Sequence, residues 1–85
     1  MKLTVLGGGG VRSPFLAGAI VHKANDLDIS EIVFMDNDKK KLLIYGGLAR
    51  EIALRINDKI KFTLTVDPVE ALKDADFVIT TLRVG

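Results

Sequence analysis

Four consecutive glycines, at residues 7–10, constrain the fold of this chain more than any other feature. They follow the short apolar run KLTVL at residues 2–6, which is typical of a buried strand. Ser13-Pro14 comes soon after them and predicts a helix start, with Ser13 as the N-cap and proline in the first helical position. A strand, a glycine turn and a helix in this order open the dinucleotide-binding unit of α/β proteins.

The rest of the chain alternates short apolar runs with helical periodicity, as βαβ units do. The expected strands cover residues 2–6, 31–35, 60–66 and 77–82. We expect a first helix from Ser13 until Asn25-Asp26, a second over 39–56, and a short third one from Asp67-Pro68 to about Asp74. The apolar face expected to pack in the second helix consists of Tyr45, Leu48, Ala49, Ile52 and Ile56.

This order of elements predicts a parallel sheet with right-handed crossovers and the strand order 3-2-1-4. That is the first half of a Rossmann-type fold, so residues 1–85 would form the N-terminal half of an NAD-binding domain. The fourth strand would lie at a sheet edge with no charge or proline to protect it, which is unusual for a natural edge. We therefore expect the parent protein to continue past Gly85 and to cover this edge.

The charge balance and the residue usage exclude several classes of function. A formal net charge of +1, from 12 basic and 11 acidic side chains, provides no basic field for nucleic acid or a membrane surface. The chain has no cysteine and only His22, which excludes a thiolate metal site within it. Its first apolar stretch is too short for a membrane span and lacks signal-peptide features, so we expect a cytoplasmic protein.

The glycine run is the first candidate site. Gly7 is expected to allow the tight turn, and Gly9, with Gly10 beside it, to let the backbone approach a pyrophosphate. The first helix would offer free N–H groups and the positive end of its dipole to the phosphates. The third glycine of the fingerprint is replaced by Arg12, which puts the close helix–strand contact in doubt but is itself a candidate phosphate ligand.

Asp36, at the end of the second strand, is the second candidate. It lies a short distance past the expected spacing of about 20 residues from the glycines, at which a carboxylate accepts hydrogen bonds from a ribose 2′-OH. It would repel a 2′-phosphate at about 4 Å by roughly 1–4 kcal/mol per unit charge, so we expect NAD rather than NADP. Lysines at 39–41 could instead serve a 2′-phosphate, but we interpret them as a solvated helix start.

Three further residues lie at the carboxyl end of the fourth strand, where ligands bind in open α/β sheets: Thr80, Thr81 and Arg83. We include Thr81 among the cofactor-binding residues. Arg83 either binds a phosphate or carboxylate of the substrate, or is a surface ion-pair partner, and both interpretations stay open. Asp67 is explained as a helix cap, with a cofactor contact as the alternative.

Three segments together resemble the family 4 glycoside hydrolases, the group of 6-phospho-β-glucosidases and 6-phospho-α-glucosidases. They are KLTVLGGGGVRSPFL, FMDND and DADFVITTLRVG, of which Ser13-Pro14 and the Arg-Val-Gly ending are the most specific parts. The resemblance implies an enzyme in which NAD oxidises the sugar C3 hydroxyl, the C1 substituent is eliminated, water adds and the ketone is reduced again. It also implies a divalent metal, usually manganese, whose ligands, like the catalytic base, lie further along than Gly85.

If the resemblance holds, the chain contains no catalytic residue and no metal ligand, and alone should not turn over a phosphorylated sugar. Homo-oligomerisation of the parent enzyme is a further expectation. Two alternatives stay open: the cofactor half of a malate- or lactate-type 2-hydroxy-acid dehydrogenase, and a non-catalytic NAD-sensing module. A P-loop nucleotide hydrolase is excluded because no Gly-Lys-Ser/Thr follows the glycines.

Overall fold

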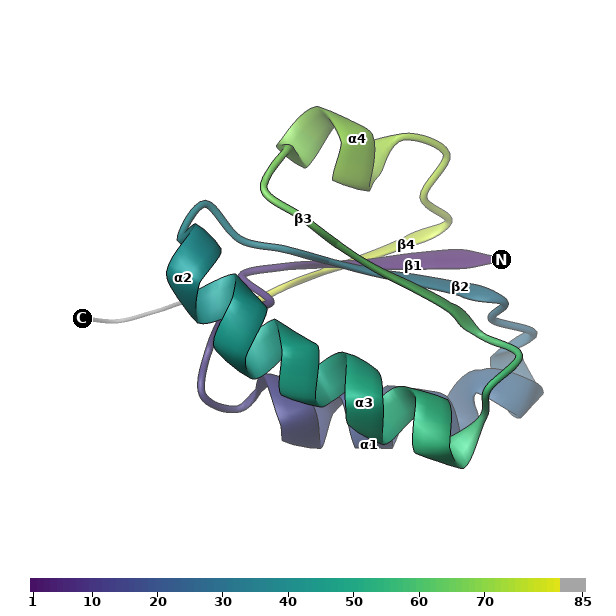
Figure 1. Cartoon of the computed structure of the whole chain (residues 1–85). Helices are drawn as coiled ribbons and strands as arrows, with labels where there is room; N and C mark the ends of the chain where they lie inside the picture. Colours follow the sequence, from purple (N-terminus) through teal and green to yellow (C-terminus); the bar gives the residue numbers. More distant parts are fainter. Residues whose placement is uncertain (82–85) are drawn as a thin grey trace.

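The computed structural model, which describes residues 1–81, is a parallel four-stranded sheet with helices on both faces (Figure 1). Its strand order, β3-β2-β1-β4, confirms the predicted 3-2-1-4 Rossmann-type arrangement. Figure 1 shows α1 and α3 side by side under one face and α4 alone over the other. The elements in chain order are β1 (Lys2–Leu6), α1 (Ser13–Leu27), β2 (Glu31–Met35), α2 (Lys39–Lys41), the π-helix η1 (Leu42–Gly46), α3 (Gly47–Ile56), β3 (Lys61–Thr65), α4 (Pro68–Leu72) and β4 (Phe77–Thr80).

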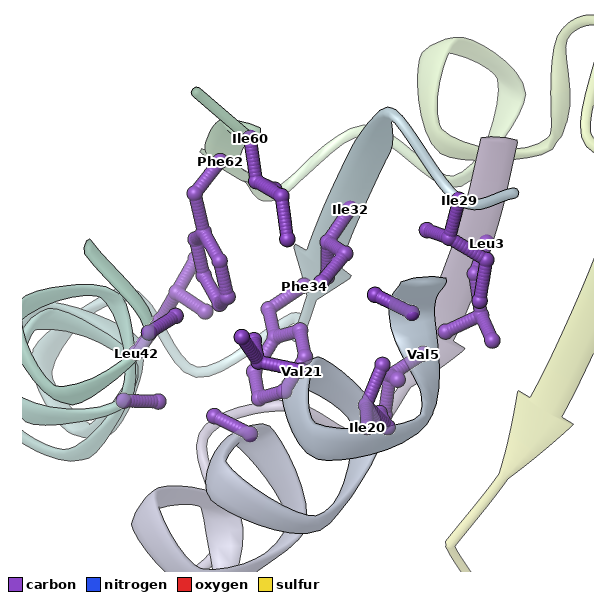
Figure 2. Packing of buried hydrophobic residues seen from close by; sticks show 14 residues of the cluster. Leu3, Val5, Ile20, Val21, Ile29, Ile32, Phe34, Leu42, Ile60 and Phe62 are labelled. Atoms are coloured by element: carbon purple, nitrogen blue, oxygen red, sulfur yellow. The ribbon is translucent and has the colours of Figure 1, made fainter. Parts of the chain in front are cut away.

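The core lies between the sheet and the α1–α3 layer (Figure 2). Val5 and Phe34, in register on neighbouring strands, are completely buried, and the Phe34 ring stacks at a tilt on Phe62 with centroids 4.9 Å apart. The helices present mainly small side chains to the sheet, among them the fully buried Ala17 and Ala49. Small residues at these contacts let the helix backbones approach the strands closely.

The start of α1 differs from the prediction. Ser13 was expected as the N-cap, but Arg12 occupies that position, and its side chain makes no capping hydrogen bond. Ser13 is instead the first helical residue because its N–H already donates to the Gly10 carbonyl at 3.0 Å, in a turn that leads into the helix. The helix ends at Leu27, later than expected, where Asp28 adopts a left-handed conformation with φ 55°.

The second helix covers the predicted range, residues 39–56, without a break, but its middle part is the π-helix η1. The predicted packing face is largely wrong: Leu48, Ile52 and Ile56 are 47%, 37% and 43% exposed. The helix has a second apolar stripe of the same period, and this one faces the core: Leu42, Gly46, Ala49 and Ala53. The stripe of small side chains faces the sheet because it allows the helix backbone to approach the strands more closely. The larger apolar residues therefore lie on the outside.

The last two elements lie where the sequence predicts them, but β4 ends at Thr80, earlier than predicted. The Asp67 carboxylate caps α4 by accepting a hydrogen bond from the Val69 N–H at 2.9 Å. β4 lies at the sheet edge, and its Phe77 and Val78 are 41% and 47% exposed. Leu82, at the expected end of this strand, lies outside the described residues. Within residues 1–81, no helix is both long and apolar enough to cross a membrane.

Candidate nucleotide-binding site

The glycine turn is held against the end of β2. The N–H groups of Gly7 and Gly8 both donate to the Met35 carbonyl, at 2.7 and 2.8 Å. Gly7 has a φ of 94°, which L-residues with side chains rarely adopt, and a Cβ there would also collide with the hydroxyl of Thr81. Gly7 therefore has the conformation that the predicted tight turn requires.

The next two glycines are required by the packing of the turn itself. A Cβ on Gly8 would come within 2.6 Å of Phe34, and one on Gly9 within 2.8 Å of the Asp36 carboxylate and 3.0 Å of the Leu42 backbone nitrogen. Sequence reasoning assigned Gly9 to the approach of a ligand and did not single out Gly8. The fingerprint leaves the position between its first two glycines open, but here that position is also a glycine, Gly8. This additional glycine was the available signal that the turn packs closely against its neighbours. Gly10, in contrast, has room for a methyl group.

Asp36 joins the turn to the carboxyl end of β2. It is only 4% exposed, and its two oxygens accept hydrogen bonds from the Gly9 N–H at 3.0 Å and the Asp38 N–H at 2.9 Å. These bonds anchor the glycine turn to the carboxyl end of β2.

Thr81 supports the turn from the other side. Its N–H donates to the Leu6 carbonyl at 3.0 Å, and its hydroxyl lies 3.2 Å from that carbonyl oxygen and 3.1 Å from that of Gly7. A hydroxyl has one hydrogen, so it serves one of these two oxygens at a time. This geometry gives Thr81 a positioning role on Gly7, in addition to its place beside the cleft described next.

A cleft of about 420 Å³ opens beyond the carboxyl ends of the strands, between β1 and its neighbours β2 and β4. This is the switch point of the 3-2-1-4 sheet, where open α/β folds bind ligands. Four of the residues that the sequence singled out meet there: Gly7, Asp36, Thr80 and Thr81. The other lining residues are Leu6, Met35, Asn37 and Pro68. Arg83 lies outside the described residues.

The start of α1 provides donors for an anion, although Gly9, Gly10 and Arg12 are not among the residues that line the cleft. Among residues 1–81, no acceptor of the chain takes up the backbone N–H groups of Val11 and Arg12. Both residues are exposed, and the Arg12 side chain takes part in no ion pair within that range. Free N–H groups at a helix start, with a guanidinium beside them, fit a phosphate. In the same range, no three His, Cys, Asp or Glu side chains cluster as a metal site.

The model of the family 4 glycosyl hydrolases matches residues 2–85, almost the entire chain. The chain belongs to this family. A 6-phospho-beta-glucosidase of Escherichia coli (strain K12) is 37% identical over the whole chain. The chain covers 19% of that relative, so it spans about a fifth of the length of the curated family members it matches.

Solved structures of family members have the same fold. A 6-phospho-alpha-glucosidase from gut microorganisms, in complex with NAD and glucose-6-phosphate, matches the whole chain with a TM-score of 0.91 and 25% identity. A 6-phospho-beta glucosidase from Thermotoga maritima, with manganese, NAD+ and glucose-6-phosphate, matches 98% of it with a TM-score of 0.82 and 28% identity. The chain covers 19% and 20% of these two proteins. Membership confirms the predicted family and favours it over the 2-hydroxy-acid dehydrogenase alternative.

Proposed function

We propose that this chain is the NAD-binding first part of a family 4 glycoside hydrolase that acts on 6-phospho-glycosides. The observation that carries the proposal is the pairing of the glycine turn with Asp36 at the switch-point cleft, in a chain of this family. The remaining catalytic machinery would lie in sequence beyond Gly85, since the matched relatives are about five times as long.

In this proposal, different residues of the chain bind different parts of the cofactor. The N–H groups at the start of α1, with Gly10 and Arg12 beside them, bind the pyrophosphate. Asp36 accepts hydrogen bonds from the adenosine ribose and repels a 2′-phosphate, which favours NAD over NADP. Gly7, Gly9 and Thr81 keep the turn in the shape that leaves room for the phosphates. Arg83 is a weaker candidate for the phosphate of the sugar.

The chemistry would require both a nucleotide and a metal. NAD supplies the hydride acceptor for the C3 position of the sugar, and a divalent cation, most simply manganese, polarises the C3 oxygen. The chain contributes binding and orientation, and no residue of it is proposed as catalytic or as a metal ligand. We expect no turnover by the 85-residue chain alone.

The substrate would be a small phosphorylated sugar, in keeping with the glucose-6-phosphate in the two similar structures. We further propose a cytoplasmic location. We also propose that the protein has no nucleic-acid or membrane partner, for which the near-neutral charge is the support.

The test is a hydrolysis assay of the complete protein with 4-nitrophenyl glucoside 6-phosphates of both anomers. We expect hydrolysis that requires added NAD+ and Mn2+ and that is lost on chelation. Hydrolysis without either component would contradict the proposal. NAD binding without any hydrolysis would point to the sensing module instead, and oxidation of malate or lactate to the dehydrogenase.

A further inference from the structure

The short helix α4 forms one wall of the nucleotide cleft. In the described part of the chain it lies alone over its face of the sheet (Figure 1), and it has five residues. A helix this short is unstable in isolation, so its position depends on contacts with the rest of the molecule. Its first residue, Pro68, lines the cleft together with Asp36 and Asn37. Whatever holds α4 in place therefore also fixes this wall.

Two side chains of β1 hold the far end of α4. The last carbonyl groups of a helix have no partner within the helix itself. The Thr4 hydroxyl donates to the Ala71 carbonyl at 2.6 Å. The Lys2 ammonium donates to the Lys73 carbonyl at 2.6 Å and to the Glu70 carbonyl at 3.3 Å. A positive charge at this end also complements the negative end of the helix dipole.

The contact with α4 explains why a polar residue lies in the middle of β1. Thr4 is completely buried, and burial of a hydroxyl is unfavourable unless the hydroxyl is hydrogen-bonded. The residues in register with it on the next two strands are Val33 and Thr63. Thr63 is half-buried, and no hydrogen bond within residues 1–81 involves its hydroxyl. Within this row of the sheet, Thr4 is thus the residue that is bonded to α4.

We propose that Thr4 and Lys2 are positioning residues for the nucleotide, which act on the cleft through α4. β1 leads directly into Gly7, so the same strand fixes the glycine turn at its end and the Pro68 wall through its side chains. Pro68 shares the cleft with Asp36, to which we assign the ribose, so it lies on the adenosine side. The inference rests on the proposed function and extends it to two residues that do not line the cleft.

The test measures how the complete protein uses NAD in the hydrolysis assay. Thr4→Val keeps the shape of the side chain but leaves the Ala71 carbonyl without its donor. We expect the NAD concentration for half-maximal hydrolysis to rise roughly fivefold or more, the effect of losing one buried hydrogen bond. At saturating NAD, kcat and the KM for the phosphorylated sugar should stay within about twofold of the wild type. A mere loss of folded protein would lower kcat and leave the NAD requirement unchanged. Thr4→Ser, which restores the hydroxyl, should recover the wild-type NAD requirement.

Lys2→Met carries the same test at a less buried position, and each variant has a matched control. Thr63→Val removes a hydroxyl from the row of Thr4, and Lys61→Met removes a charge from the row of Lys2. We expect Lys2→Met to raise the NAD requirement and both controls to leave it unchanged. Wild-type NAD requirements in Thr4→Val and Lys2→Met, or equal effects in the controls, would overturn this inference alone. A wild type that hydrolyses without NAD would overturn the proposed function as well.

Discussion

Gly9 and Gly10 stand side by side in the glycine turn, but their surroundings differ. A methyl group on Gly9 would meet the Asp36 carboxylate at 2.8 Å and the Leu42 nitrogen at 3.0 Å, whereas the nearest atom to one on Gly10 is 3.6 Å away. We predict that Gly9→Ala lowers the free energy of unfolding by about 1–3 kcal/mol, the usual cost of overpacking, and that Gly10→Ala changes it little. Denaturant unfolding of both variants is the measurement. A Gly9→Ala variant as stable as Gly10→Ala would show that the turn relaxes around the methyl group.

Asp36 connects stability to cofactor choice. Asp36→Asn keeps the size of the side chain but has one acceptor oxygen for the two N–H groups of Gly9 and Asp38. The N–H that loses its acceptor should cost about 1–3 kcal/mol of stability. The loss of the negative charge should also narrow the preference for NAD over NADP, as measured by calorimetry. Asp58→Asn, at an exposed position, is the control for both readouts. An unchanged cofactor preference would remove Asp36 from the ribose site.

Among the helices, Gly46 is the last residue of η1 and Gly47 is the first residue of α3. A methyl group on Gly46 would touch Leu42 and Leu64 at 3.1 Å, while nothing lies within 4 Å of one on Gly47. We predict that Gly47→Ala raises the melting temperature, because alanine in a helix is favoured over glycine by about 0.5–1 kcal/mol. Gly46→Ala should gain less or lose stability, because the two leucines must move. The reverse order of the two melting temperatures would contradict this account.

The order of the elements could be predicted from the sequence, whereas the side of a helix that faces the sheet could not. Strands such as β2 are nearly continuous apolar runs between turn residues. This pattern is typical of strands that are buried on both faces of a parallel sheet. The second helix, however, carries a large and a small apolar stripe of equal period, and the pattern alone does not say which one packs. The prediction of Ser13 as the N-cap was wrong because the Ser13 N–H closes a local turn on the Gly10 carbonyl, which the residue types alone do not reveal. The η1 segment has no distinct signature in the residues.

Across the whole molecule, the residues of the site and the end of the sheet at which they lie could be predicted from the sequence. The hydrogen bonds that connect these residues could not. Gly7, Asp36 and Thr81 lie at one end of the sheet, as parallel strands require. Their mutual contacts, from Asp36 to Gly9 and from Thr81 to Gly7, depend on how the turn folds back over β2. These contacts make the turn a braced structure before any ligand binds, so we expect the chain to bind without a large rearrangement.

The last prediction follows from the extent of the sheet. One βαβαβ half of a Rossmann-type fold binds one mononucleotide, and the described strands form that half with β4 added. We therefore expect ADP-ribose and NAD to raise the melting temperature of the chain equally, and nicotinamide mononucleotide to have no effect. At a ligand concentration 100 times Kd, the stabilisation should be about 2.7 kcal/mol, readily visible in a thermal unfolding curve. Equal stabilisation by nicotinamide mononucleotide would mean that the second half of the cofactor is also bound here, on the β4 side of the cleft.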